Sequence, residues 1–197
     1  MDRDTNDFYQ LNARKWAAAF PYEFSAFLDP FCMRLEPGAK VLELGCGDGR
    51  DAARMEAKGL VVDPTDGTQS MAELAAERLG RPARQMEFGQ LDVIEGYDAV
   101  WAHAALHHQP IAGLDDVLGR ILRALKPGGW FFANYKLGTG EARDALGRLY
   151  NFPPRADLMA LYDRPRWSIM EAHDYRDSGM DKVVRNWVAI TVQKDAA

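Results

Sequence analysis

The sequence is poor in cysteine, in basic residues and in long apolar runs. Its 197 residues include only Cys32 and Cys46, which are too few for a disulfide framework and lack the companions of a zinc site, so we expect no metal. Lys and Arg number 24 against 29 Asp and Glu, and the net charge of −5 disfavours a nucleic-acid partner. No apolar run approaches the roughly 20 residues that cross a bilayer, so no membrane span is expected. Residues 1–7 are polar and precede no apolar secretion segment, which predicts a cytoplasmic protein.

The composition is that of one globular domain. Hydrophobic residues make up 47% and charged residues 27% of the chain, and its length suits a single hydrophobic core. Residues 1–36 predict a helical cap that belongs to this same domain. A first helix is expected from about Asn6 to Phe20, ended by Pro21, and a second from Phe24 to Leu35, kinked or broken at Pro30.

From residue 37 to residue 197, the expected core of the domain, strands alternate with helices. Short apolar stretches predict strands at Val41–Leu44, Leu60–Val62, Arg84–Phe88, Tyr97–Ala102 and Trp130–Tyr135. Amphipathic segments predict helices at Asp51–Lys58, Gln69–Leu79, Leu114–Leu125 and Asp157–Tyr162. Two more β-stretches, with a turn candidate at Asp177-Ser178-Gly179 between them, are expected at Trp167–Tyr175 and Asn186–Val192. This order predicts a Rossmann-like, doubly wound α/β fold whose seven-stranded, mostly parallel sheet ends in an antiparallel hairpin.

A glycine-rich turn follows the first strand. Gly45, Gly47 and Gly49 stand at alternate positions there, so the backbone can turn sharply and no Cβ separates the chain from a ligand. The free N–H groups at the start of the next helix point toward the same space. Because ligands of open α/β sheets bind at the carboxyl ends of the strands, the turn predicts a nucleotide-like ligand. A plain connection between strand and helix is the alternative.

An acid at the end of the second strand would grip the ribose of such a ligand through its hydroxyls. Asp63 and Asp66 both qualify, and Pro64 between them is expected to interrupt the strand ladder. We favour Asp66, which lies about 20 residues after the glycine turn and is followed by a capped helix start. Helix capping by Asp66 or Thr68 is the alternative role.

These motifs together resemble the class I S-adenosylmethionine-dependent methyltransferases. The resemblance rests on the run from Val41 to Gly49, on the acid-glycine-threonine step at Asp66, and on Leu125-Lys126-Pro127-Gly128-Gly129 before the fifth strand. The spacing is most similar to small bacterial members of the tellurite-resistance-like or methyltransferase-domain type. The resemblance implies methyl transfer from S-adenosylmethionine to a small-molecule acceptor, with S-adenosylhomocysteine as the product.

The resemblance also implies roles for individual residues. Gly45 and Gly47, with the backbone of Cys46, would wrap the methionine part of the cofactor, and Glu43 would orient its amino group. The residues expected around the ribose, the adenine and the methyl path are Asp66, Gly67, Met71, Gln90, Leu91, Ala102 and His103. Many relatives carry an aspartate after the third strand, and here either Gln90 or Asp92 would take that place.

Three histidines follow the fourth strand on the ligand side of the sheet. His103 and His107 are candidate catalytic residues, as a general base for an acceptor that carries a proton. His108 is expected to pack or to hydrogen-bond within the loop. No nearby Cys or carboxylate completes a metal-binding set with recognisable spacing. A methyltransferase works mainly by positioning its reactants, so the lack of a catalytic triad does not argue against an enzyme.

Aromatic residues are frequent in the first two helices. They either pack these helices on the sheet or form a lid, in which Tyr9 and Trp16 would face the methyl group. Residues 135–140 are expected to form another wall of the pocket, and further aromatic surface is expected from Tyr150, Phe152 and Trp167. Such a pocket suits a small, partly apolar acceptor.

Two other functions share part of this pattern. A NAD-binding oxidoreductase would use the same turn and ribose acid, but the spacing of Gly45, Gly47 and Gly49 lacks the two-residue gap of the dinucleotide fingerprint. A non-catalytic, regulatory S-adenosylmethionine-binding module would need no equipped acceptor pocket. The methyltransferase interpretation fits best, while the acceptor and the oligomeric state stay open.

Overall fold

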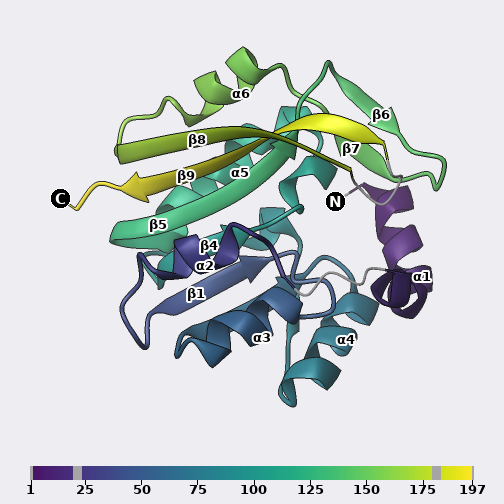
Figure 1. The fold of residues 1–197 in the computed structure, drawn as a ribbon, viewed down its shortest axis with the longest axis horizontal. Coiled ribbons are helices and arrows are strands. Elements are labelled where there is room, and N and C mark those ends of the chain that lie inside the picture. The colour runs from purple at the N-terminus through teal and green to yellow at the C-terminus, as the bar shows by residue number, and fades with distance from the viewer. Residues whose placement is uncertain (1, 20–23, 179–182, 197) are drawn as a thin grey trace.

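The computed structural model describes residues 2–19, 24–178 and 183–196. Within these ranges seven strands form one sheet in the order β3-β2-β1-β4-β5-β9-β8. The strands are β1 (Lys40–Leu44), β2 (Val61–Asp66), β3 (Arg84–Gln85), β4 (Tyr97–Ala102), β5 (Leu125–Lys136), β8 (Trp167–Ser178) and β9 (Val184–Lys194). The first five in sequence pair in parallel, whereas β9 is antiparallel to both β5 and β8. The predicted fold class is confirmed (Figure 1).

Helices cover both faces of this sheet. They are α1 (Arg3–Ala19), α2 (Leu28–Cys32), α3 (Arg50–Ala57), α4 (Gln69–Leu79), α5 (Ile111–Ala124) and α6 (Arg155–Tyr162), with 3₁₀ turns at Phe88–Gln90 and Leu106–His108. α2 and α3 bury one face in a core around Met55 and Trp101, and α5 and α6 bury the other around Leu118 and Tyr162. None of the described helices combines the length and the apolar character that crossing a bilayer requires.

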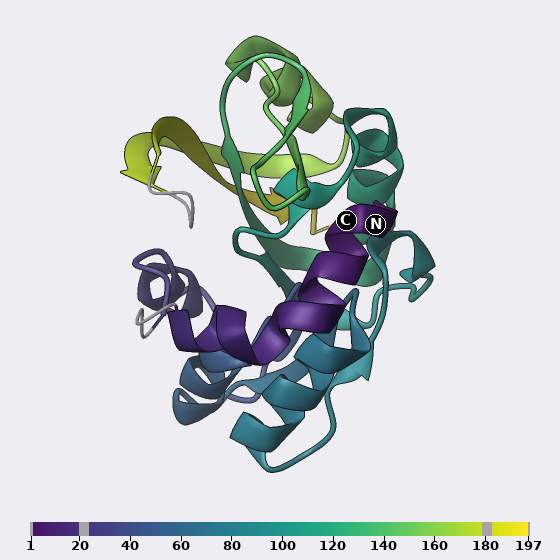
Figure 2. The same cartoon turned by 90° about the vertical axis from the view of Figure 1, so that its right-hand side faces the viewer.

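Helix α1 lies against α4 beside the carboxyl ends of the parallel strands (Figure 2). Side-chain hydrogen bonds hold it there: Gln10 Nε2 donates to Ser70 Oγ at 2.7 Å, and Asn6 Nδ2 donates to the Gly67 carbonyl at 3.1 Å. The helix begins three residues earlier than predicted, and its predicted end at Phe20 and Pro21 lies outside the described residues.

The second predicted helix is much shorter than expected. It covers Leu28–Cys32 rather than the span from Phe24 to Leu35. Pro30 is the third residue of this helix, and the first helical turn tolerates proline because its N–H groups have no intrahelical partner. The third strand is likewise short, because the chain turns into 3₁₀ geometry at Phe88.

Two predictions about strand ends were wrong. Pro64 does not interrupt β2, which continues to Asp66. The Thr65 carbonyl faces β1, where it accepts from N–H groups of the glycine turn. Because neighbouring residues of a strand direct their backbone groups to opposite sides, the nitrogen of Pro64, which has no hydrogen, faces β3. The pairing of β2 with β3 begins only at Thr65, so no hydrogen bond of the sheet is lost. β5 starts at Leu125, opposite Tyr97, instead of at Trp130. The predicted Pro-Gly-Gly break is present as a shift of register within the strand.

A small separate hairpin was not predicted. It pairs β6 (Glu141–Arg143) with β7 (Leu149–Asn151). The two strands of the terminal hairpin were predicted, but β8 runs through Asp177 and Ser178, two residues of the expected turn. Gly179, the third residue of that turn, lies outside the described residues.

Candidate functional site

The glycine turn joins β1 to α3 in a left-handed backbone conformation. Gly45, Gly47 and Gly49 have φ angles of +77°, +53° and +77°, a region that residues with a Cβ rarely adopt. A Cβ at Gly45 would stand 2.6 Å from the Cβ of Ala105, so this position is also sterically closed to larger residues. A Cβ at Gly47 would meet only the ring of Trp16, at 3.5 Å, which is ordinary contact.

The structure separates the two candidate acids. Asp63 is bound away from the turn, where it accepts from Arg84 at 2.8 Å and from the Tyr97 hydroxyl at 2.6 Å. Asp66 accepts from the Gly47 N–H at 3.1 Å and from the Thr68 N–H at 2.9 Å. Burial raises the pKa of Asp66 although these hydrogen bonds act in the opposite direction. Asp66 therefore ties the glycine turn to the start of α4.

Glu43 is a buried carboxyl beside the same turn. Its side chain is 3% exposed, and its Oε2 has no hydrogen-bond partner within the described part of the chain. Burial, followed by the nearby Asp51 and Asp66 charges, raises the pKa of Glu43 well above its usual range. A buried acceptor without a partner is costly, so it indicates a polar ligand group.

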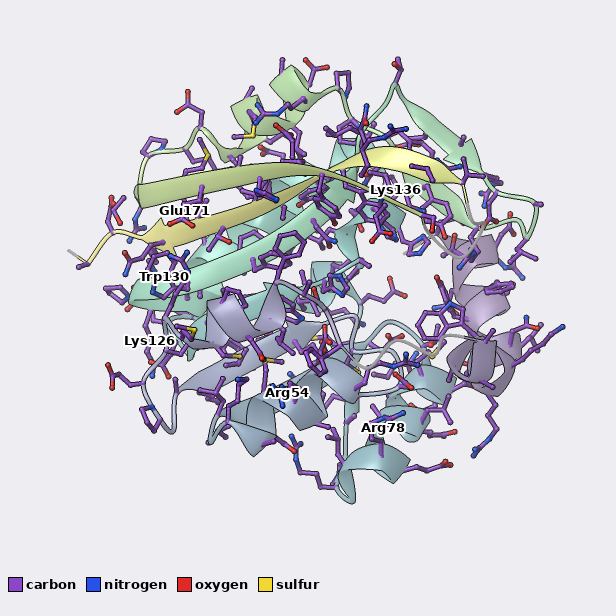
Figure 3. All side chains as sticks on the ribbon, viewed as in Figure 1. Arg54, Arg78, Lys126, Trp130, Lys136 and Glu171 are labelled. Carbon is purple, nitrogen blue, oxygen red and sulfur yellow. The ribbon has the colours of Figure 1, made fainter. Side chains whose placement is uncertain are left out.

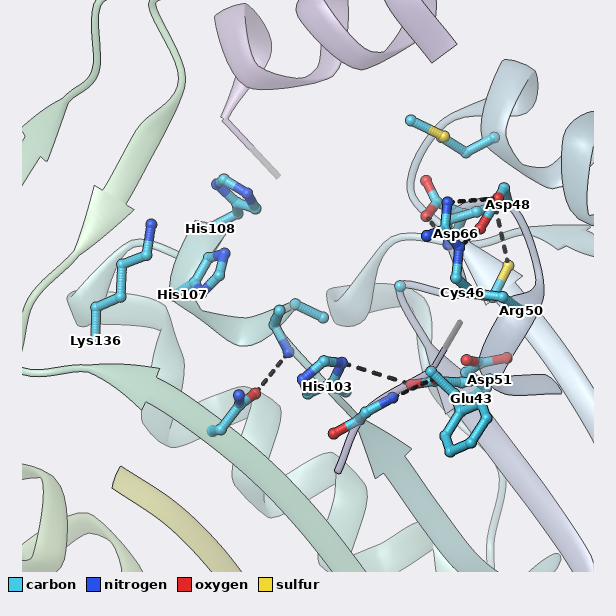
Figure 4. A pocket seen from close by; sticks show the side chains of 18 of the residues that line it. Glu43, Cys46, Asp48, Arg50, Asp51, Asp66, His103, His107, His108 and Lys136 are labelled. Carbon is cyan, nitrogen blue, oxygen red and sulfur yellow. Dashed lines mark hydrogen bonds and ion pairs between the residues drawn. The ribbon is translucent and has the colours of Figure 1, made fainter. Parts of the chain in front are cut away.

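A cavity of about 550 Å³ opens at the carboxyl ends of the parallel strands. It brings together most of the predicted site residues, namely Glu43, Gly45, Cys46, Gly47, Asp66, Gly67, Met71, His103 and His107. Figure 4 shows the acidic residues at one end of this cavity, His107, His108 and Lys136 at the other, and His103 between them. Tyr9 and Trp16 of α1 also line it.

Three predicted site residues do not line the cavity. Gln90 turns its side chain back to accept from the Glu87 N–H at 2.8 Å, as part of a capping box. Leu91 and Ala102 are fully buried in the hydrophobic core. Phe88, two residues before Gln90, lines the cavity instead. The 3₁₀ turn at Phe88–Gln90 accounts for this, because it turns the chain away from the extended path that the prediction assumed.

His103 is paired with a carboxylate that the sequence analysis did not single out. Its Nδ1 lies 3.5 Å from Oδ2 of Asp51, the second residue of α3. Asp51 is itself fixed, because it accepts from Trp101 Nε1 at 2.9 Å and from the Ser25 N–H at 3.2 Å. Burial acts to raise the pKa of Asp51, but these hydrogen bonds and the His103 charge outweigh it and lower the pKa. Asp51 is therefore a carboxylate that orients the ring of His103.

His108 belongs to a buried hydrogen-bond network. Its Nδ1 donates to the Leu149 carbonyl at 2.7 Å, which leaves Nε2 to accept from the Tyr9 hydroxyl at 3.0 Å. The Tyr9 hydroxyl in turn accepts from Arg148 at 2.9 Å, and Arg148 is paired with Asp144. Burial lowers the pKa of His108 to about 3, so this ring is neutral. The prediction that His108 hydrogen-bonds within the fold is confirmed.

His107 differs from its neighbour. Its side chain is 4% exposed, and its Nδ1 has no hydrogen-bond partner in the described residues. Burial, together with the nearby cations of Lys136 and Arg148, lowers the pKa of His107 well below its usual range. His107 therefore presents a neutral imidazole with an unused nitrogen.

Sequence reasoning missed several cavity residues. Asp51, Arg148 and Trp187 gave no local signal, because each gains its role from partners far along the chain. Trp167, which was expected to add aromatic surface, packs against the core instead. Among the described residues no group of three or more His, Cys, Asp or Glu side chains is placed to hold a metal.

Comparison with known proteins identifies the class. Residues 42–131 match the family model described as a methyltransferase domain. The chain is 30% identical over 141 residues to the 27-O-demethylrifamycin SV methyltransferase of Amycolatopsis mediterranei, covering 67% of this chain and 46% of that protein. It is also 30% identical to an uncharacterised methyltransferase of Synechocystis sp., over 66% of this chain and 59% of that protein. This chain therefore spans about half the length of these relatives.

Solved structures agree on the fold. The 1,6-didemethyltoxoflavin-N1-methyltransferase of Burkholderia thailandensis, which was solved with its substrate and S-adenosylhomocysteine, superimposes with a TM-score of 0.74 at 22% identity, covering 98% of this chain and 88% of that one. The [4+2]-cyclase SpnF superimposes with a TM-score of 0.75 at 16% identity, covering 98% and 95%. Residues 42–131 therefore match a methyltransferase domain, and the chain shares the fold of a methyltransferase solved with S-adenosylhomocysteine. The tellurite-resistance-like subgroup stays a prediction. Because the same fold also serves a cyclase, the fold alone does not define the reaction.

Proposed function

We propose that this chain transfers a methyl group from S-adenosylmethionine to a small-molecule acceptor. One observation carries the proposal: the glycine turn and Asp66 form one wall of the cavity. The glycines of this wall have left-handed backbone conformations and no side chains, so a ligand can contact the backbone directly. When bound there, S-adenosylmethionine supplies a methyl group activated by a sulfonium, and its thioether product is S-adenosylhomocysteine. A small-molecule acceptor is supported by the names of two similar proteins, the 27-O-demethylrifamycin SV methyltransferase and the 1,6-didemethyltoxoflavin-N1-methyltransferase.

The residues present fit this cofactor. Gly45, Cys46 and Gly47 would hold its methionine part, and the unpartnered Oε2 of Glu43 would accept from its amino group. Asp66 would accept from the ribose hydroxyls. Gly67, Met71 and Phe88 line the cavity beyond Asp66 and would contact the adenine.

We assign the proton chemistry to His103 and contact with the acceptor to His107. Asp51 holds Nδ1 of His103, so the other ring nitrogen is left to take a proton from an acceptor hydroxyl. The hydroxyl O–H bond would break and its proton would move to His103. The acceptor oxygen would form its bond to the methyl carbon as the bond from sulfur to that carbon breaks, with the electron pair of the broken bond left on the thioether sulfur. Cavity walls contributed by Tyr9 and Trp16 exclude water from this step.

The remaining predictions belong to the same proposal. Residues 1–36 would act as a cap of the domain formed by residues 37–197, which the hydrogen bonds of Asn6 and Gln10 to the α4 region support. A cytoplasmic location rests on the low cysteine content, and the lack of a nucleic-acid partner rests on the net charge of −5.

The test is calorimetric titration with S-adenosylhomocysteine, followed by turnover of S-adenosylmethionine with a panel of hydroxyl, amine and thiol acceptors. Asp66→Ala should weaken S-adenosylhomocysteine binding by about 1–3 kcal/mol, because charge-assisted hydrogen bonds to the ribose are lost. Asp63→Ala is the matched control, since Asp63 is bound to Arg84 and Tyr97 away from the cavity.

Thermal unfolding of both variants shows whether each still folds. Equal affinities of the two variants would contradict the assignment of the ribose acid. Saturable binding of NADH without any binding of S-adenosylhomocysteine would favour the oxidoreductase. Tight binding without turnover on any acceptor would favour a regulatory module.

A further inference from the structure

The cavity changes character from one end to the other. The carboxyl groups of Glu43, Asp48, Asp51 and Asp66 line the end formed by the glycine turn. Arg50 lines the same end and pairs with Asp48, so the excess of acidic groups there comes from the other three. At the far end, beyond His103, lie His107, His108 and the cation of Lys136 (Figure 4). Of the described residues, one further carboxylate lines the cavity, that of Asp177, which is an exposed residue of β8. The two ends of the cavity therefore suit ligand groups of opposite charge.

Strand register builds the far end from one row of side chains. Lys136 of β5 pairs directly with Trp187 of β9, and Trp187 pairs with Tyr175 of β8. Residues opposite one another in neighbouring strands project from the same face of a sheet. The Trp187 and Tyr175 rings stack with centroids 6.0 Å apart. A cation and two flat rings thus stand side by side on the cavity face of the sheet.

Lys136 is held as a buried cation among aromatic faces. Its side chain is 2% exposed, and its Nζ lies 3.8 Å from the ring centroid of Tyr150 and 5.3 Å from that of Trp187. A buried ammonium is costly unless its surroundings compensate it, and the ring faces do so in part. Arg148 is a second buried cation, its guanidinium carbon 5.3 Å from the centroid of the same Tyr150 ring, but Asp144 pairs with it at 2.6 Å, so Lys136 carries the argument.

His107 supplies a hydrogen-bonding group at the same place. Its ring lies 5.0 Å from Tyr150 and 5.7 Å from Trp187, measured between centroids. Its Nδ1 is buried and lacks a hydrogen-bond partner among the described residues. A neutral imidazole that carries its proton on this nitrogen would donate to an acidic oxygen.

We infer that the far end of the cavity binds the acidic group of a planar acceptor, which makes the methyl acceptor an aromatic acid that carries a hydroxyl. This inference rests on the proposed function and names its substrate class. The carboxylate would meet Lys136 and His107, the ring would lie against Trp187 and Tyr150, and the hydroxyl would face His103. The acidic end is left to the cofactor, whose sulfonium and amino groups are positive.

The experiment compares two ligands of the same shape and different charge. Protein saturated with S-adenosylhomocysteine is titrated calorimetrically with 4-hydroxybenzoate and with its neutral analogue 4-hydroxybenzamide. We expect the acid to bind at least about tenfold more tightly than the amide, as a charge-assisted contact provides. This comparison needs no variant, so it tests the inference even where a substitution impairs folding.

Lys136→Met removes the charge and keeps an unbranched side chain between the rings. It should abolish the preference for the acid and leave the affinity for the amide within about twofold. Lys126→Met is the matched control, because Lys126 lies at the other end of β5 and pairs with Asp98 outside the cavity (Figure 3). This control should keep the preference.

Four outcomes overturn the inference: no binding of the acid at millimolar concentration, equal binding of acid and amide, an equal loss for both ligands in Lys136→Met, or the same loss in Lys126→Met. If S-adenosylhomocysteine itself does not bind, the proposed function fails, and the two ligands are then compared on the cofactor-free protein. Preference for the acid in that setting would still support a subsite for an acidic group at the Lys136 end of the cavity.

Discussion

Gly47 tests whether the glycine turn is bare because a ligand lies against it. In Gly47→Ala the new Cβ would stand 3.5 Å from the ring of Trp16, so the protein itself accommodates the methyl group without a clash. The remaining cost is the left-handed backbone at φ +53°, which is about 1–2 kcal/mol for a residue with a Cβ. The methyl group would, however, occupy space beside the turn that the cofactor needs. We expect affinity for S-adenosylhomocysteine to fall at least tenfold, or about 1.4 kcal/mol.

Gly59→Ala provides the control for backbone strain. Gly59 has a φ of +82°, with nothing within 4 Å of its would-be Cβ, and it follows α3 at the end remote from the turn. The two variants should lose similar stability in thermal unfolding, while only Gly47→Ala loses affinity in calorimetry. If both variants bind S-adenosylhomocysteine as tightly as the parent, the space beside Gly47 is not a ligand site and the reasoning fails.

Two further variants test the buried carboxyls. Burial raises the pKa of Glu43, so its ionisation opposes folding above the unfolded pKa of about 4.3, and the penalty grows as the pH rises toward the folded value. Glu43→Gln should therefore raise the Tm of the ligand-free protein at pH 7 and leave it nearly unchanged near pH 4; an equal change at both values would contradict this. Asp51→Asn removes the charge that orients His103 and should lower kcat on the order of 100-fold with little change in KM. Its pH–rate profile should shift relative to the parent, and an unshifted profile with an unchanged kcat would show that Asp51 is only structural.

The main parallel strands were predictable because their signal is local. β1 and β4 are buried on both faces, so each appears in the sequence as a short, mostly apolar run that a single acidic residue interrupts. The β6–β7 hairpin gave no such signal, because Glu141, Ala142 and Arg143 are all exposed. The second helix was predicted to be too long, because its apolar periodicity continues through residues that lie outside the helix in the structure.

The candidate site divides in the same way. The glycine turn and Asp66 were predictable because each directly follows an apolar strand and the two lie close in sequence. In the structure the Gly47 N–H donates a hydrogen bond to Asp66. Tyr9 and Arg148, in contrast, are 139 residues apart in sequence, and only the fold brings the hydroxyl to the guanidinium. No local pattern marks such a pair. The sequence indicated that residues 135–140 and Tyr150 lie in the pocket, and Lys136 and Tyr150 do line it, but the contacts among the side chains of the acceptor end could not be derived from the sequence.

The arrangement of charge explains why one histidine, rather than three, suits the role of base. His108 has both ring nitrogens engaged, by the Leu149 carbonyl and the Tyr9 hydroxyl, and so has no site for another proton. His107 lies near the cations of Lys136 and Arg148, which oppose its protonation. His103 alone of the three has a carboxylate, Asp51, close to its ring. In the proposed reaction the positive charge leaves the sulfonium and appears on the base, so we propose the histidine that has a carboxylate, Asp51, 3.5 Å from its ring nitrogen as the base.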